Sequence, residues 1–265
     1  MFIILNETLK GMNSSNIDRV AQALLSARRE GRCADAELIA TALENADQAY
    51  AVQAIVARTL AWEDAGTAYW KSGGASRDAT LTHARLPPAG VWASPAQSGD
   101  WPFTWRGIEA EIALRLGASV DAAQAAGLDY AGAAALVDAM AVSIEVVDSR
   151  WQQGLAAPAL LKLADLQSHG ALVLGEWQAY ADRDWATQRC RVNIGAQAIE
   201  RRGTHSMGDP AYGLLAWLRH ATREGRRVEA GTVVTTGTWV GILPASEGDL
   251  VTAEFEGIGY ASVRL

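Results

Sequence analysis

The segment "RGIEAEIALRLG", residues 106–117, places two glutamates inside an otherwise apolar run. Glu109 and Glu111 are two positions apart, a spacing that directs both side chains to the same face of a β-strand. Two carboxylates on one covered face repel each other and lose hydration. We therefore predict a strand here whose acidic face either contacts a positive group or is open to water.

A second apolar segment, "SIEVVDSR" at residues 143–150, contains another unexpected acid. Glu145 lies between Ile144 and Val146 in a strand-like setting. Hard divalent cations such as Mg²⁺ or Mn²⁺ take several oxygen donors, so a metal site needs a third carboxylate beside Glu109 and Glu111. One reading is therefore a metal site on a sheet, and the other is a solvent-facing strand edge with surface glutamates.

Composition narrows the setting in which these acids occur. The chain has 265 residues, of which 49% are hydrophobic and 20% charged, as in an ordinary globular protein with a sizeable core. A formal charge of −7 disfavours binding to nucleic acid or to an anionic membrane. Cys33 and Cys190 have no pairing or zinc-like spacing, and the apolar run in "MFIILNETLK" is short. We expect a cytoplasmic protein.

Residues 1–65 have a helical pattern and are predicted to form a small N-terminal region. The segment 16–31 has apolar residues at helical spacing, with Asn16 as a candidate cap and Gly31 as a stop. The segment 35–62 continues the pattern, with a break expected near Asn45.

Residues 66–265 are predicted to form an α+β domain that carries the acidic site. A connection rich in Pro and Gly covers residues 86–103. Short β-like runs are expected at 141–150, 171–177, 231–239 and 249–265, and helices at 128–140, 157–166 and 209–225. The last helix begins with Asp209 before Pro210, a good capping pair, and ends at Gly225.

Together these motifs resemble the 2-keto-4-pentenoate hydratase and 4-oxalocrotonate decarboxylase branch of the fumarylacetoacetate hydrolase superfamily. The second glutamate of "GIEAEIALRLG" is followed 34 residues later by the glutamate of "IEVVDSR". Further matching segments are "DQAYAVQ", "YWKSGGASR", "GDPAYGLLAWL" and the C-terminal stretch from residue 229. The resemblance implies a curled mixed β-sheet body, like the C-terminal domain of that superfamily. It also implies Mg²⁺ or Mn²⁺ bound by Glu109, Glu111 and Glu145.

The loop "WKSGGASR" is similar to the substrate-binding lysine loop of the family. The resemblance implies a catalytic Lys71, as a positive group or proton relay beside the substrate, and a substrate-binding Ser76. Gly74 replaces the usual large apolar residue and Ala75 the usual threonine, which makes the substrate uncertain. Asp78 is a candidate acid or base. The alternatives are a solvated loop lysine and a surface turn aspartate.

Four other residues have a functional and a structural reading. Gly237 and Thr238 resemble the family's Thr-Gly-Thr turn, which implies substrate binding by backbone amides and a hydroxyl; the alternative is an ordinary β-turn. Arg150 could orient a ligand glutamate, or be an ordinary ion-pair partner. His205 could reach the site, although a single loop histidine more often has no chemical role.

The chain contains ten tryptophans, four of which lie near the lysine loop and the first acidic strand. Trp70, Trp92, Trp101 and Trp105 could line a pocket for an aromatic or extended substrate. Burial in the core or at a subunit interface is the alternative.

The resemblance implies a metal-dependent lyase of aromatic catabolism, and hydration of a 2-hydroxydienoate or 2-oxo-alkenoate is the leading reaction. Decarboxylation of a vinylogous 2-oxo diacid is the second, hydrolysis of an acylpyruvate the third, and a non-catalytic partner subunit the fourth. The expected partners are a small 2-oxo acid and further copies of the chain, with association to a related decarboxylase or hydratase. Apolar alternation up to the C-terminus favours a homo-oligomer.

Overall fold

The computed structural model describes residues 2–62 and 66–265, with side chains from residue 15 onward, and these form two compact units. The first unit comprises the described residues of Met1–Asp64 with Pro102–Trp105 and Asp148–His169. The second comprises those of Ala65–Trp101 with Arg106–Val147 and Gly170–Leu265. The boundary expected at residue 65 remains a prediction.

The first unit is helical. Its elements are α1 (Phe2–Glu30), η1 (Glu37–Ile39), α2 (Ala46–Thr59), η4 (Gly154–Ala156) and α5 (Ala159–Ala164). The break at Asn45 is confirmed, because its side chain accepts a hydrogen bond from the Gln48 amide and caps α2. Gly31 follows α1 with φ +63°, as a helix-stopping glycine does. The cap predicted at Asn16 is wrong, because α1 begins at Phe2 and Asn16 lies inside the helix.

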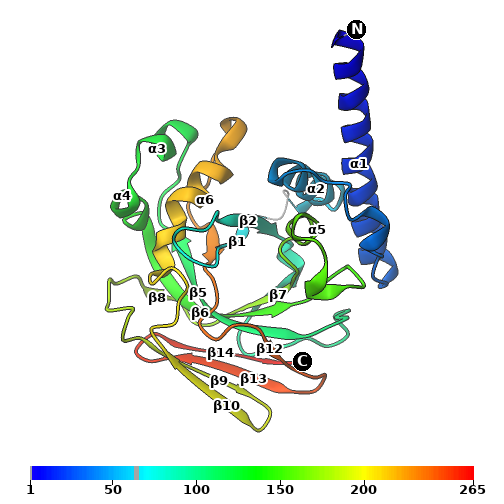
Figure 1. Cartoon of the computed structure of the whole chain (residues 1–265). Helices are drawn as coiled ribbons and strands as arrows, with labels where there is room; N and C mark the ends of the chain where they lie inside the picture. The colour runs from blue at the N-terminus through cyan, green and yellow to red at the C-terminus, as the bar shows by residue number, and fades with distance from the viewer. Residues whose placement is uncertain (1, 63–65) are drawn as a thin grey trace. The chain divides into compact units, whose positions relative to one another are not determined.

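The second unit is built on a mixed nine-stranded sheet that curls into a half-barrel (Figure 1). Its strands are β1 (Tyr69–Gly73), β2 (Thr82–Leu86), β3 (Val91–Ala93), β5 (Gly107–Leu116), β6 (Val137–Val147), β7 (His169–Leu174), β8 (Gln178–Ala179), β11 (Val233–Thr235) and β12 (Leu243–Pro244). The order is β2-β1-β11-β5-β6-β7-β3, with β12 on β5 and β8 on β6. The long strands β5 and β6 therefore lie at the centre.

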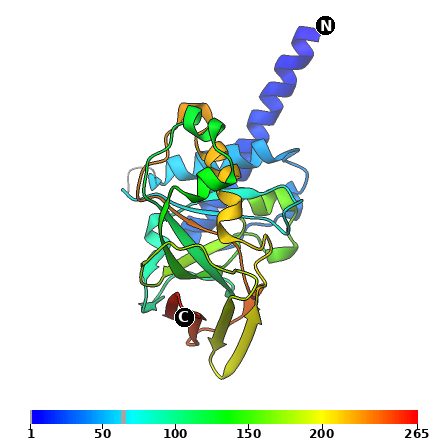
Figure 2. The ribbon, with the colours of Figure 1, turned by 90° about the vertical axis from the view of Figure 1, so that its left-hand side faces the viewer.

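A second sheet has the order β10-β9-β13-β14-β4. Its strands are β4 (Ala96–Gln97), β9 (Arg189–Ile194), β10 (Gln197–Arg202), β13 (Leu250–Phe255) and β14 (Gly259–Arg264). Along β13, Val251, Ala253 and Phe255 are buried and the residues between them are not, so one face joins the core. The predicted C-terminal strands are confirmed. The β9–β10 hairpin, at the bottom of Figure 2, was not predicted, although apolar residues alternate with polar ones along β9.

Short helices complete the second unit: η3 (Pro88–Gly90), α3 (Ala122–Gly127), α4 (Tyr130–Ala134), η5 (Pro210–Gly213), α6 (Leu214–Ala221) and η6 (Arg223–Gly225). Asp209 caps the turn that leads into α6, as predicted. The helix predicted over 128–140 is wrong beyond Ala134, because β6 begins at Val137. Most of β6 is buried on both faces, and such an apolar run has no period that separates strand from helix.

The predicted α+β class with a curled mixed sheet is confirmed. Among the described residues, no helix has the combination of length and apolarity that a bilayer crossing requires.

Candidate metal centre and active site

The antiparallel pairing of β5 and β6 brings the three predicted glutamates together. Glu109 is the cross-strand partner of Glu145, and Glu111 is the partner of Ser143. One carboxylate oxygen from each glutamate lies within 4.8 Å of the others. Glu111 and Glu145 are buried and Glu109 is half-buried, so the face they share is covered by protein. The reading of a wet strand edge with surface glutamates is therefore wrong.

Lys71 is the positive group that the acidic face requires. Its Nζ lies 2.5 Å from Glu145 Oε1, and the side chains of the pair are 14% and 0% exposed. Burial works against the ammonium charge, but the three carboxylates around it hold the pKa of Lys71 above its ordinary value. Lys71 is therefore protonated at neutral pH and is not a solvated loop lysine.

One ammonium does not balance three buried carboxylates. Burial and the nearby Glu145 raise the pKa of Glu109 to about 7, although Lys71 acts in the opposite direction. Burial, Glu145 and Glu109 raise the pKa of Glu111 well above its ordinary value. Without a cation the cluster therefore holds protons at neutral pH, and a bound cation would take their place.

The donor set fits a hard divalent cation. Carboxylate oxygens are the ligands that such ions prefer, and two oxygens bound to one ion at 2.0–2.6 Å are at most about 5 Å apart. The three glutamate oxygens meet this limit. The structure therefore supports the grouping of Glu109, Glu111 and Glu145, and their role as ligands is taken up below as a proposal.

Two buried hydroxyls next to the glutamates were not predicted. Thr235 Oγ1 donates a hydrogen bond to Glu111 Oε2, and Ser143 Oγ lies 2.9 Å from Thr235 Oγ1. Ser143 had a signal in the sequence, because it is two positions from Glu145 and therefore on the same strand face. Thr235 had none, since its approach to Glu111 depends on the pairing of β11 with β5.

The lysine loop contacts two other loops of the second unit. A Cβ on Gly73 would lie 3.9 Å from Gly237 Cα, and Ser206 Oγ donates to the Gly74 carbonyl at 2.8 Å. A Cβ on Gly74 would lie only 2.6 Å from Leu81 Cδ2, so the Leu81 side chain occupies the space of a larger loop residue. Glycine at position 74, where the family pattern has a large apolar residue, is therefore matched by the position of the Leu81 side chain.

The remaining candidates of this loop differ in exposure. Ser76 is half-buried, and its carbonyl accepts from the Ala79 amide in a turn. Asp78 lies in the same turn and is exposed. The geometry of Asp78 matches the reading of a surface turn residue, and its role as acid or base remains a prediction.

Gly237 and Thr238 form a tight turn after β11. Gly237 has φ +88°, a conformation that favours glycine. Thr238 Oγ1 donates to the Gly241 carbonyl at 3.1 Å and accepts from the Val240 amide, so it already stabilises the turn. Buried His205 adjoins this turn, where its Nε2 bonds to the Thr236 carbonyl. Substrate binding by Gly237 and Thr238 remains a prediction.

Arg150 has ion-pair partners within the first unit. Its Nε lies 2.6 Å from Asp165 Oδ1, its amide also donates to Asp165, and Nη1 is 3.8 Å from Asp148 Oδ2. Of the two readings of Arg150, the structure supports the ion-pair partner.

The four tryptophans do not form one cluster. Trp70 directly precedes Lys71 on β1, so the two side chains point to opposite faces of the strand. The Trp70 ring packs edge-on against Trp217, with ring centroids 6.0 Å apart. Trp92 and Trp101 contact each other edge-on at 5.3 Å, and Trp105 is 37% exposed. Trp70 is therefore a core residue on the strand face opposite to Lys71.

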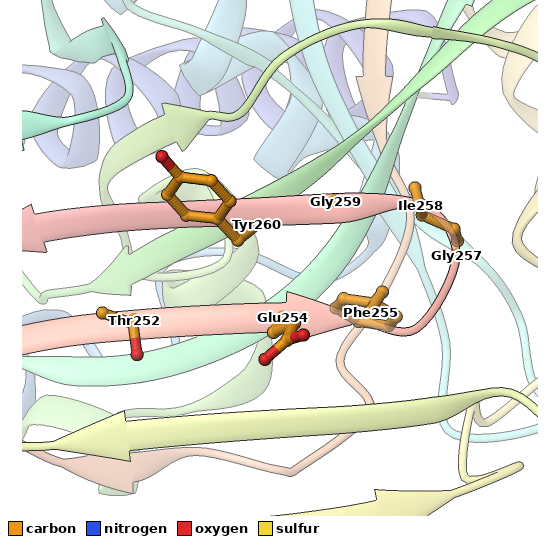
Figure 3. Close-up of a pocket in the computed structure, with 7 residues that line it drawn as sticks. All are labelled: Thr252, Glu254, Phe255, Gly257, Ile258, Gly259 and Tyr260. Carbon is orange, nitrogen blue, oxygen red and sulfur yellow. The ribbon is translucent and has the colours of Figure 1, made fainter.

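A hollow of about 500 Å³ lies on the β13–β14 hairpin (Figure 3). Its lining residues are Thr252, Glu254, Phe255, Gly257, Ile258, Gly259 and Tyr260. Neither Lys71 nor any of the three clustered glutamates lines it, so this hollow is distinct from the acidic site.

Comparisons with known proteins agree with this fold. Residues 56–265 match the sequence model of the family described as "Fumarylacetoacetate (FAA) hydrolase C-terminal". A 2-keto-4-pentenoate hydratase 1 of Dechloromonas aromatica (strain RCB) is 27% identical over 92% of this chain and 95% of its own length. A 4-oxalocrotonate decarboxylase of a Pseudomonas species is 27% identical over 58% of this chain and 59% of its own length. That match thus spans less than two thirds of the decarboxylase.

Solved structures show the same fold. The 4-oxalocrotonate decarboxylase from Pseudomonas putida G7 aligns with a TM-score of 0.80 at 18% identity, over 95% of this chain and 97% of that chain. It was solved with calcium and acetate and with magnesium and adipate. The predicted family resemblance is therefore confirmed.

Proposed function

Because the chain belongs to the fumarylacetoacetate (FAA) hydrolase C-terminal family, we propose that it is a divalent-metal-dependent lyase. The reaction proposed is the addition of water to a 2-hydroxydienoate or 2-oxo-alkenoate. One observation carries the proposal: three buried or half-buried glutamates present oxygens within 4.8 Å of one another beside a buried lysine.

In this proposal Glu109, Glu111 and Glu145 hold Mg²⁺ or Mn²⁺. Such an ion, when bound, supplies Lewis-acid stabilisation to the carboxylate and 2-oxygen of a 2-oxo acid. Three carboxylates offset the charge of the ion with single-atom contacts, and hard cations of this kind take six or more oxygens. Positions for substrate oxygens then remain.

Lys71 is proposed to act on the substrate from the side of the site formed by β1. Its protonated ammonium attracts the substrate carboxylate and can supply a proton to the carbon chain when the dienol becomes a ketone. Proximity to Glu145 keeps the side chain in place. Ser76, Gly237 and Thr238 are proposed to bind the substrate carboxylate, and Asp78 to be the acid or base for the water that adds.

Decarboxylation of a vinylogous 2-oxo diacid is the second candidate. The full-length relative favours hydration, whereas the decarboxylase structure has the same fold over nearly the entire chain. Both reactions need an electron-withdrawing cation beside a 2-oxo acid, so the three glutamates serve either one.

In the deciding experiment, purified protein is incubated with Mg²⁺ or Mn²⁺ and with each of three substrates in turn. These are 2-hydroxypenta-2,4-dienoate, 4-oxalocrotonate and an acylpyruvate. Loss of diene absorbance with formation of the hydrated 4-hydroxy-2-oxo acid and without CO₂ release indicates hydration, CO₂ release indicates decarboxylation, and free pyruvate indicates hydrolysis. Glu109→Gln, assayed in parallel, controls for contaminating enzymes. If all three substrates persist while the metal binds, the proposed lyase is wrong and a non-catalytic partner subunit is favoured.

We also propose that the chain forms a homo-oligomer. Large apolar side chains remain exposed, among them Leu38 at 73%, Tyr260 at 61% and Tyr130 at 53%. Association would cover part of this area. Light scattering at micromolar concentration should report a mass well above that of one chain, and a single species of monomer mass would contradict the proposal.

A further inference from the structure

The two unpredicted hydroxyls connect three strands at the acidic cluster. Thr235 lies on β11, where its neighbours are Lys71 on β1 and Ala113 on β5. Ser143 lies on β6, directly opposite Glu111 on β5. Thr235 and Ser143 are fully buried, and Glu111 is 2% exposed, so water does not reach this group of polar atoms freely.

The hydrogen bonds between these residues have a fixed direction. In the metal-bound state of the proposed function Glu111 is ionised and has no proton to donate, so its contact with Thr235 uses the single hydroxyl proton of Thr235. The contact between Ser143 Oγ and Thr235 Oγ1 must then use the proton of Ser143. The hydrogen bonds therefore run from the Ser143 hydroxyl to the Thr235 hydroxyl and end at Glu111 Oε2.

This series of hydrogen bonds restricts the orientation of the Glu111 carboxylate more than burial alone would. A buried carboxylate oxygen has to be hydrogen-bonded, and Thr235 is the donor that an adjacent strand supplies. The β-branched threonine has few χ1 rotamers, so its hydroxyl is held in one place by β11. Glu111 is thereby held through Oε2, and its carboxylate plane cannot rotate without breaking the bond.

We propose that Thr235 is a positioning residue for Glu111, and that Ser143 orients the Thr235 hydroxyl. Their role is to preset the Glu111 carboxylate for a divalent cation, which sets the affinity of the site. The inference rests on the proposed function, in which Glu111 is a metal ligand. Partners of this kind in other metal sites change affinity when they are removed.

The test measures Mn²⁺ binding by titration calorimetry on chelator-treated, full-length protein. Thr235→Val keeps the shape of the side chain and removes its hydroxyl, whereas Thr235→Ser keeps the hydroxyl. Ser143→Ala and the double variant complete the series. Thr222→Val is the matched control, because Thr222 is likewise buried, at 2% exposed, and its hydroxyl donates at 2.7 Å to a backbone carbonyl, that of Leu218.

We expect Thr235→Val to raise the Kd for Mn²⁺ about 10- to 100-fold. Thr235→Ser should bind more tightly than Thr235→Val, and Ser143→Ala should have a smaller effect than Thr235→Val. The double variant should match Thr235→Val alone, because Ser143 acts only through Thr235. Thr222→Val should keep the parent Kd.

Melting in EDTA separates positioning from plain stabilisation. If Thr235→Val and Ser143→Ala lower only the melting temperature and leave the Kd unchanged, the hydroxyls are structural and the proposal is wrong. If Thr235→Val does not fold, an unchanged Kd in Ser143→Ala overturns it. A parent protein that binds no Mn²⁺ would instead refute the metal site itself, so the two failures are distinguishable.

Discussion

Replacing Glu109 by glutamine tests the acidic cluster most directly, because it removes one negative charge and nearly preserves the side-chain shape. At 4.8 Å and an effective dielectric constant of about 20, each pair of charges interacts by about 3.5 kcal/mol. Burial is the largest cost for charged Glu109, and repulsion from Glu145 adds to it, while attraction to Lys71 offsets part of both. A pKa raised from 4.5 to about 7 corresponds to a penalty of about 3 kcal/mol for charged Glu109.

The effect of Glu109→Gln has a defined pH dependence. The pKa of Glu109 is higher in the folded than in the unfolded state, so its contribution to stability is lost as pH rises from about 4.5 to about 7. In EDTA, Glu109→Gln should therefore gain up to about 3 kcal/mol in the free energy of unfolding at pH 8. Near pH 4 the gain should vanish, because Glu109 is protonated in both states.

A divalent cation should reduce this difference in stability. Glu109→Gln lacks one ligand charge, so its Mg²⁺ affinity should fall at least tenfold, which is about 1.4 kcal/mol of binding free energy. Excess Mg²⁺ then stabilises the parent more than the variant. Urea unfolding at pH 4, 6 and 8, with EDTA and with Mg²⁺, measures both effects.

Glu44→Gln is the control for this experiment, because Glu44 is exposed and lies in the other unit. Its change should stay within about 0.5 kcal/mol under all conditions. The reasoning is refuted if Glu109→Gln is less stable than the parent in EDTA at pH 8, or if Mg²⁺ stabilises both equally.

Three further predictions concern Lys71, Asp165 and His83. Lys71→Met should lower turnover at least 100-fold while the Mn²⁺ Kd, measured by calorimetry, stays equal or falls, because a competing cation beside Glu145 is removed; retained turnover would contradict this. Asp165→Asn should cost about 3–5 kcal/mol in urea unfolding, since it leaves the buried charge of Arg150 with only the more distant carboxylate of Asp148, and an unchanged midpoint would disprove it. Burial and a nearby guanidinium lower the pKa of His83 to about 4, so the parent should lose up to about 3 kcal/mol of stability as pH falls from 6.5 to 4. His83→Asn should flatten that decline, and an identical pH profile would argue against the assignment.

Local sequence patterns were enough to predict the central strand β5 and its acidic face. An apolar run with Glu109 and Glu111 two positions apart specifies a strand with an acidic face, because strand side chains alternate with a period of two. The same alternation predicted β-structure over residues 249–265, whereas Glu145 was assigned to a strand from its apolar neighbours. The break expected at Asn45 and the cap expected at Asp209 located helix starts, since a helix start depends on only a few neighbouring residues.

The groups that complete the acidic face come from distant segments, and the tertiary structure was needed to identify them. The alternation of side chains along β5 predicts the face that Glu111 occupies. The pairing of β5 with β6 and β11 determines that Ser143 and Thr235 lie beside Glu111. Lys71 is separated from Glu145 by 74 residues, and their contact follows from the sheet order β1-β11-β5-β6. Strand register is set by pairing between distant segments, so no local pattern in the sequence contains it.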